Sequence, residues 1–181
     1  MDKQIEVRSR RAYFDTRLGQ LHVRTAFPGT GGFDEHTTLI CVHPAGSSSR
    51  VFAAFLPLMA ADRSVYAPDR PGHGESDGSP NGDTAMHAEA LADLAADLRL
   101  RKIDVLGVQD GAAVALALAA AKPDLVRRLV LVGPQGERAA APQPTLNLRL
   151  GAAGSAEFPV DVLDAQPTAL AKAVGAFLNQ R

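Results

Sequence analysis

Two polar residues, Gln109 and Asp110, stand between Gly107 and Gly111 where an apolar run gives way to a helical pattern. Small neighbours of this kind allow a tight strand-to-helix turn that projects a side chain above a sheet. A carboxamide can polarise a carbonyl group but is a poor nucleophile, whereas an aspartate carboxylate can be a covalent nucleophile. The pair therefore favours carbonyl or acyl chemistry at this turn, with a helix N-cap as the structural alternative for Asp110.

Alternating strand and helix patterns predict the sheet that positions this turn. Short apolar runs with β-branched residues occur at 38–42, 64–67, 103–108 and 129–132, and each is too short for a helix. Helical spacing covers residues 50–60, 84–98 and 112–121, and a last helix is expected over 168–178. We therefore expect an α/β fold with a doubly wound, mostly parallel sheet of about seven strands.

The two ends of the predicted sheet differ from its centre. Residues 12–15 and 20–26 alternate in polarity and are expected to form an antiparallel hairpin at one edge. At the other end, residues 133–144 contain prolines, alanines and glycines and precede a strand-like segment at 145–150. A parallel crossover needs about a dozen residues. This connection is barely sufficient, which indicates that a strand-helix unit is missing.

Composition restricts the function classes. The 181 residues carry 19 basic and 20 acidic side chains, a net charge of −1, so nucleic acid and membrane surfaces are not expected partners. One domain over 1–181 is predicted, with a cytoplasmic location because neither a signal peptide nor an apolar span is visible. The single Cys41 excludes an internal disulfide and is expected to be a buried thiol. No metal or cofactor is expected.

Three sequence blocks carry a resemblance to a known superfamily. Val42–Gly46, followed by Tyr66–Asp77, resembles the oxyanion loop and the Asp-x-Pro-Gly-x-Gly-x-Ser turn of α/β-hydrolases. Val105–Ala119 is similar to the strand, nucleophile elbow and helix of that superfamily, and Gly154–Pro159 to the stretch that bears its catalytic histidine. The resemblance implies an α/β-hydrolase fold shortened by loss of the cap.

The resemblance also implies a site without the usual serine and histidine. Gln109 falls at the nucleophile position and Glu157 at the histidine position. Glu157 can act as a base only if burial or a neighbouring carboxylate raises its pKa. Pro44 replaces a glycine and has no N–H, which leaves the amide of Ala45 as the oxyanion donor. His43 begins this loop and borders the site, either as a catalytic group or as a residue that holds the loop.

A second register places Asp110 at the tip of the turn, where it resembles the nucleophile of haloalkane dehalogenases. This register needs Ala112 at a position that is usually glycine. Three hypotheses follow: an enzyme of the lyase, isomerase or cyclase type using Gln109, Asp110 and Glu157, a hydrolase with Asp110 as nucleophile, and a non-catalytic binding or assembly module. The first is preferred, because the turn gathers polar groups instead of apolar ones.

The loss of the cap also leads to an expectation about assembly. Deleting a unit between Gly133 and Thr145 removes cover from the strand edge near Leu146, Leu148 and Leu150. Uncovered edges and apolar patches are usually paired or hidden in proteins. We therefore expect a homodimer through this edge, with cover by the Ala139–Pro144 loop and the final helix within one chain as the competing outcome.

Overall fold

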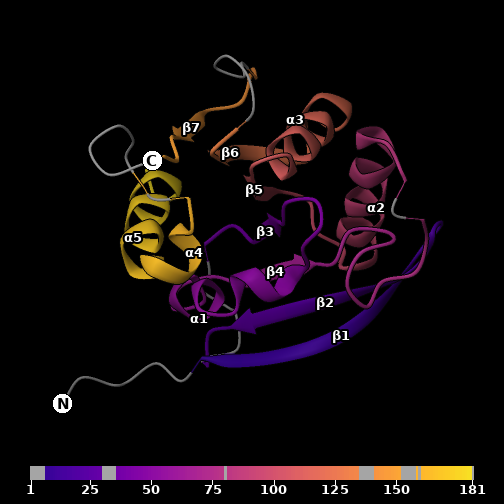
Figure 1. The fold of residues 1–181 in the computed structure, drawn as a ribbon, viewed down its shortest axis with the longest axis horizontal. Coiled ribbons are helices and arrows are strands. Elements are labelled where there is room, and N and C mark those ends of the chain that lie inside the picture. The colour runs from indigo at the N-terminus through magenta and orange to yellow at the C-terminus, as the bar shows by residue number, and fades with distance from the viewer. Residues whose placement is uncertain are drawn as a thin grey trace.

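A seven-stranded sheet with helices on both faces forms the protein (Figure 1). The computed structural model describes residues 7–29, 36–79, 81–134, 141–151, 158 and 160–180. The strand order is β1-β2-β4-β3-β5-β6-β7. The pairs β1–β2 and β2–β4 are antiparallel, and the remaining four pairs, β4–β3, β3–β5, β5–β6 and β6–β7, are parallel. The expected fold class is confirmed. The strands are β1 Arg8–Thr16, β2 Gly19–Phe27, β3 Leu39–Val42, β4 Val65–Pro68, β5 Ile103–Val108, β6 Val126–Val132 and β7 Thr145–Leu148.

Two groups of helices cover the two faces of the sheet. In Figure 1, α1, α4 and α5 lie together on one side, while α2 and α3 lie on the other. The expected helix over 84–98 is α2 (Thr84–Asp97), that over 112–121 is α3 (Gly111–Ala121), and the last is α5 (Pro167–Leu178). A short α4 (Val162–Ala165), which the sequence pattern did not predict, precedes α5.

Strand alternation explains the two cores. Leu39 and Cys41 of β3 point into the cluster beneath α1, α4 and α5, whereas Ile40 and Val42 point into the cluster beneath α2 and α3. All four side chains are buried, because the central strands are covered on both faces. The expected buried thiol at Cys41 is confirmed.

The segment expected as one helix over 50–60 is divided. A 3₁₀ turn, Ser49–Phe52, is followed by a separate helix α1, Phe55–Met59. Pro57 lies in the first turn of α1, where a missing N–H is tolerated, but it cannot continue a helix from upstream. Phe52 and Phe55 are both fully buried, so the division keeps both rings in the core.

The two edges of the sheet are unequal. The hairpin predicted at one edge is present and longer than expected, because β1 and β2 pair over nine residues each. At the other edge, β7 pairs in parallel with β6, and Leu148 is only 5% exposed against the α5 side of the core. Leu146 and Leu150 are partly buried and pack against the same cluster. The final helices therefore cover this edge's apolar residues on one face.

A buried ionic network fixes the end of α5 to the sheet. Asp104 of β5 is fully buried and accepts hydrogen bonds from Arg127 at 2.9 and 2.6 Å. Arg127 and Arg128 also donate to the carbonyl of Leu178, at the last residue of α5. Asp104 also lies 3.8 Å from the fully buried Arg63, so removing the Asp104 charge would leave Arg63 buried with less compensation. In the ranges that the structure describes, no helix is long and apolar enough to cross a membrane.

Candidate functional site

The turn between β5 and α3 has the backbone geometry of a nucleophile elbow. Gln109 has a φ of +52°, in the left-handed region that non-glycine residues rarely adopt. A Cβ at Gly107 would lie 2.4 Å from the Gly111 carbonyl oxygen, and one at Gly111 would lie 2.5 Å from the Val42 carbonyl oxygen. Both glycines are therefore required by close backbone contacts, and the sharp turn follows from them.

The backbone distinguishes the two registers left open by the sequence. The positive φ falls on Gln109, whereas Asp110 has ordinary helical angles of −68° and −20°. Gln109 N–H donates to the Val132 carbonyl at 2.8 Å, which ties the turn to the end of β6. Gln109 consequently occupies the tip of the turn, and Asp110 follows it as the first residue before α3.

Asp110 connects the turn to two neighbouring loops. Its Oδ1 accepts a hydrogen bond from the Ala45 amide at 2.6 Å, and its Oδ2 accepts one from Arg70 Nη1 at 3.0 Å. Asp110 occupies the N-cap position of α3, but its side chain makes no capping hydrogen bond to the helix. The Ala45 amide, expected as an oxyanion donor, is thus already bound to a carboxylate.

His43 holds the loop that follows β3. It is fully buried, its Nε2 accepts a hydrogen bond from the Arg70 amide at 2.9 Å, and its Nδ1 lies 2.8 Å from the Pro44 carbonyl. Burial lowers the pKa of His43 to about 4, so the ring is neutral at pH 7 and Nδ1 carries the proton. Both ring nitrogens are used, and this geometry matches the loop-holding alternative.

The loop after β4 is organised by a second buried carboxylate. Asp69 accepts hydrogen bonds from the amides of Ser49 at 2.6 Å and Glu75 at 2.9 Å, and from His22 Nδ1 at 2.9 Å. Burial acts to raise the pKa of Asp69, but these hydrogen bonds outweigh it and hold the pKa below its usual value. A Cβ at Gly74 would lie 2.1 Å from Asp69 Oδ2, so glycine is required there. Asp69 therefore fixes the loop that carries Arg70.

Three histidine rings form a row beside this loop. The ring centroids of His43 and His73 are 5.4 Å apart, and those of His73 and His87 are 5.7 Å apart. His87 comes from the first turn of α2 and is 5% exposed, and its buried Nδ1 has no hydrogen-bond partner within the described part of the chain. Burial lowers the pKa of His87, and the charge of Arg70 adds to this effect. Burial therefore favours the neutral forms of His43 and His87 at the two ends of this row.

Of the predicted site residues, the structure brings Gln109, Asp110, His43 and Ala45 together at the carboxyl ends of β3 and β5. Glu157 lies outside the described residues. No group of three or more side chains suited to a metal ion occurs within the described ranges.

Arg70 was not predicted as a site residue. It is the second residue after β4, and the carboxyl ends of parallel strands are where ligands bind in open α/β sheets. That rule, applied to every polar residue after a strand, would have drawn attention to it. The approach of His87 to the same loop depends on how α2 packs and has no local sequence signal.

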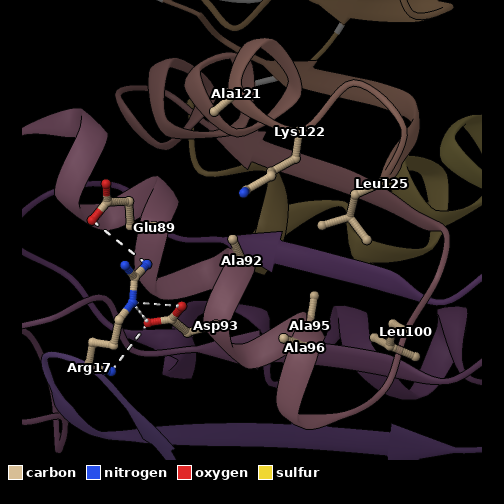
Figure 2. A pocket seen from close by; sticks show the side chains of 10 residues that line it. All are labelled: Arg17, Glu89, Ala92, Asp93, Ala95, Ala96, Leu100, Ala121, Lys122 and Leu125. Carbon is tan, nitrogen blue, oxygen red and sulfur yellow. Dashed lines mark hydrogen bonds and ion pairs between the residues drawn. The ribbon is translucent and has the colours of Figure 1, made fainter.

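A separate cavity of about 500 Å³ lies toward the C-terminal ends of α2 and α3, away from the elbow (Figure 2). Alanines form much of its wall, and Lys122 points into it. Arg17, at the turn between β1 and β2, is held by Asp93 at 2.9 Å and lies 3.9 Å from Glu89. The charges at its rim largely compensate one another. Because α3 separates this cavity from the elbow by about 15 Å along the helix, it is distinct from the site at Gln109.

Comparison with known proteins assigns a family. The profile described as the alpha/beta hydrolase family matches residues 39–180. The 2-hydroxymuconate semialdehyde hydrolase of Pseudomonas sp. (strain CF600) is 36% identical over 106 residues, which cover 54% of this chain and 36% of that protein. The 2-hydroxy-6-oxononadienedioate/2-hydroxy-6-oxononatrienedioate hydrolase 2 of Pseudomonas putida is 32% identical over 142 residues, covering 74% and 49%. The chain thus spans about a third to a half of these two relatives.

A solved structure resembles the chain over nearly its whole length. The crystal structure of a predicted CIB-like hydrolase from Thermoplasma acidophilum superposes with a TM-score of 0.81 and 16% identity, covering 96% of this chain and 99% of that one. At this identity the likeness concerns the fold alone, and it shows the same short architecture in a second chain. With its elbow turn, its seven-stranded sheet and a profile match over most of its length, the chain belongs to the alpha/beta hydrolase family.

Proposed function

We propose that this chain is an enzyme that acts on a small carbonyl- or acyl-containing compound without a serine nucleophile, as a lyase, isomerase or cyclase. The observation that supports this most is the strained backbone of Gln109, at φ +52°. A left-handed residue with a Cβ costs about 1–2 kcal/mol, and strain of this kind concentrates at functional sites. A glycine would remove the cost, so the presence of a carboxamide at the tip of the elbow supports a functional role for it.

The chemistry follows from the groups at the turn. The Gln109 carboxamide can donate an N–H to the carbonyl oxygen of a bound compound. Removal of a proton beside that carbonyl then places negative charge on the oxygen, where the N–H and the nearby N-terminus of α3 stabilise it. Glu157 would accept the proton, or Asp110 once it has left the hydrogen bonds from Ala45 and Arg70 that stabilise its charge. Return of the proton at a different carbon completes an isomerisation, and expulsion of a leaving group completes an elimination.

The relatives support the carbonyl-containing substrate class. The names of the two matched hydrolases specify a semialdehyde and a pair of oxo-dioates, all of which carry a carbonyl group. These activities belong to proteins of which the chain covers half or less. They support a carbonyl-containing substrate for this chain, and the type of reaction is the subject of the tests below.

A hydrolase with Asp110 as nucleophile is less well supported by the geometry. The carboxylate already accepts hydrogen bonds from Ala45 and Arg70, which stabilise its charge and reduce its nucleophilicity. Turnover in ¹⁸O-labelled water tests this alternative, because an ester intermediate at Asp110 would leave the label in its carboxylate. A non-catalytic binding module is the remaining alternative.

Proton exchange tests the proposal directly. The chain is incubated in D₂O with a panel of small ketones, aldehydes and 2-oxo acids, and loss of the protons beside the carbonyl is followed by NMR. We expect exchange above the buffer rate for at least one compound, and a decrease of about 100-fold in Gln109→Ala because one donor to the developing oxyanion is lost.

The matched control is Arg99→Ala, since Arg99 has the same positive φ of +56° and is exposed at the end of α2. It should leave exchange unchanged. Absence of exchange across the whole panel would favour the non-catalytic module, and exchange that survives Gln109→Ala would remove Gln109 from the reaction.

A further inference from the structure

Arg70 is a buried cation behind an exposed carboxylate. Its side chain is 4% exposed, against 39% for the side chain of Asp110, and the two are joined at 3.0 Å. Its Nε is buried and has no hydrogen-bond partner among the residues that the structure describes. Burying a guanidinium is costly unless its donors are used. One donor of the guanidinium that pairs with Asp110 therefore remains unused.

Asp110 turns away from the helix that it precedes. It makes no capping hydrogen bond to α3, and its two oxygens instead bind the Ala45 amide and Arg70. The carboxylate thus lies between a backbone N–H and a guanidinium, next to the N-terminus of an eleven-residue helix. A backbone amide, an arginine and a helix N-terminus are the groups that bind carboxylates and phosphates in proteins.

The geometry points to a carboxylate-binding subsite formed by Arg70 and the Ala45 amide, which Asp110 occupies in the free protein and vacates when a carboxylate-bearing ligand binds. The ligand class is a small oxo acid, whose carboxylate takes the place of the Asp110 carboxylate. Its carbonyl then falls beside Gln109, the residue immediately before Asp110. Placing the carbonyl at Gln109 rests on the proposed function, whereas binding of the carboxylate does not require turnover.

The surrounding charges leave Arg70 as the group that selects the ligand. His43 contacts the loop through the Arg70 amide and is neutral at pH 7. His87 lies beyond His73 in the histidine row and has a lowered pKa, so it adds no full charge at neutral pH. Asp110 is the carboxylate that joins Arg70 in a salt bridge within the described ranges. The neighbouring Asp69 carboxylate is bound by the Ser49 and Glu75 amides and by His22. Arg70 is therefore the charged group that an anion replacing Asp110 would contact.

Competition by Asp110 makes the inference testable by binding alone. An internal carboxylate that occupies the subsite competes with an external one. The apparent affinity for the external carboxylate equals its intrinsic affinity multiplied by the fraction of molecules in which the subsite is open. Asp110→Asn keeps the size of the side chain and removes its charge. We expect this variant to bind pyruvate at least about tenfold more tightly than the unmodified chain at pH 7.

The experiment titrates pyruvate and its uncharged methyl ester into the unmodified chain, Asp110→Asn, and Asp110→Asn combined with Arg70→Lys. Affinity is measured by calorimetry, and the Ala45 amide is followed by ¹H-¹⁵N NMR. Pyruvate should shift the NMR signal of the Ala45 amide in Asp110→Asn. Adding Arg70→Lys to that variant should weaken pyruvate binding, because the bidentate guanidinium donor is lost. The affinity for methyl pyruvate should not differ between the variants.

Equal affinity of Asp110→Asn and the unmodified chain for pyruvate would overturn the inference, as would equal binding of pyruvate and its ester. The Ala45 signal reports on folded protein, so a destabilised variant is recognised by its spectrum. Tight pyruvate binding without proton exchange would sustain the subsite while removing the proposed enzyme. Proton exchange without any effect of Asp110→Asn on binding would do the reverse.

Discussion

At the scale of single residues, the site depends on a side chain in a conformation that glycine would adopt more easily. Gln109 has φ +52° at the elbow, and Arg99 has φ +56° after α2. Only the first lies beside the carboxyl ends of the central strands. Because strain in the two residues is similar, their substitutions separate a folding role from a functional one.

Replacing Gln109 by glycine should raise the free energy of unfolding by about 0.5–1 kcal/mol, since glycine relieves the left-handed strain and loses part of that gain to chain entropy. Urea denaturation measures the change, and Arg99→Gly is the control with the same expected gain. If Gln109→Gly were destabilised while Arg99→Gly was stabilised, the Gln109 side chain would be serving the fold and the functional argument from strain would fail.

His43 makes the stability of the folded chain depend on pH. Its pKa is about 4 in the folded chain and about 6.5 when unfolded, so the unfolded chain binds the proton more strongly. The contribution of neutral His43 is fully present above pH 6.5 and is lost as pH falls toward 4, by about 3 kcal/mol in total. His43→Gln, which can still accept from the Arg70 amide, should flatten this slope.

Thermal or urea unfolding measured from pH 7.5 to 4.5 compares the two chains. His87 also has a lowered pKa and adds a slope of the same sign, so the difference between the unmodified chain and His43→Gln isolates His43. Identical slopes in the two chains would mean that His43 is not held neutral by the fold.

At the scale of elements, glycines decide how closely α3 approaches β3. A Cβ at Gly111 would lie 2.5 Å from the Val42 carbonyl and 2.8 Å from the His43 carbonyl, both of them backbone atoms that cannot move aside cheaply. At Gly175, inside α5, no atom of the described residues lies within 4 Å of the added atom. The same substitution should therefore have opposite effects in the two helices.

Gly111→Ala should lower the free energy of unfolding by at least about 2 kcal/mol through backbone displacement, whereas Gly175→Ala should raise it by about 1 kcal/mol through helix propensity. Chemical denaturation of both variants decides this. A neutral Gly111→Ala would show that α3 can move away from β3 without cost and that the elbow is looser than described.

The sequence predicted most of these elements because their signals are local. Apolar runs and helical spacing located the four central strands and three of the longer helices to within a few residues. The division at Pro57 and the short α4 depend on how the rings of the core pack, which periodicity does not report. The glycines of the elbow predicted the turn, but the contact between Arg70 and Asp110 joins residues 40 apart and needed the fold.

At the scale of the whole molecule, the two sheet edges differ in their capacity to pair with another chain. The β1 edge carries Arg8, Arg10 and Arg11, and such charges oppose edge-to-edge pairing. At the other edge, Phe158 bridges to Leu150 beyond the end of β7. Among the described residues no strand pairs with the outer side of β7, where a symmetric partner strand could add.

We predict a homodimer through this edge, which the net charge of −1 does little to oppose. Leu148 is buried under α5 and is unsuitable for testing the dimer, because its substitution would disturb the core.

Asn147 is the better position for the test. The carbonyls of Pro144 and Leu148 face β6, so by alternation the backbone amide of Asn147 faces away from β6. Asn147→Pro should therefore convert the dimer to a monomer in light scattering at micromolar concentrations. A monomeric unmodified chain would exclude the dimer.

We predict that this member of the alpha/beta hydrolase family works without a hydroxyl nucleophile at its elbow. Labelling with a fluorophosphonate, followed by intact-mass and peptide mass spectrometry, tests it most directly. We expect no stoichiometric adduct, because Gln109 occupies the tip and Asp110 is bound to Ala45 and Arg70. One phosphonyl group per chain on a single serine, with Ser47–Ser49 near the loop after β3 as the place to search, would contradict the account.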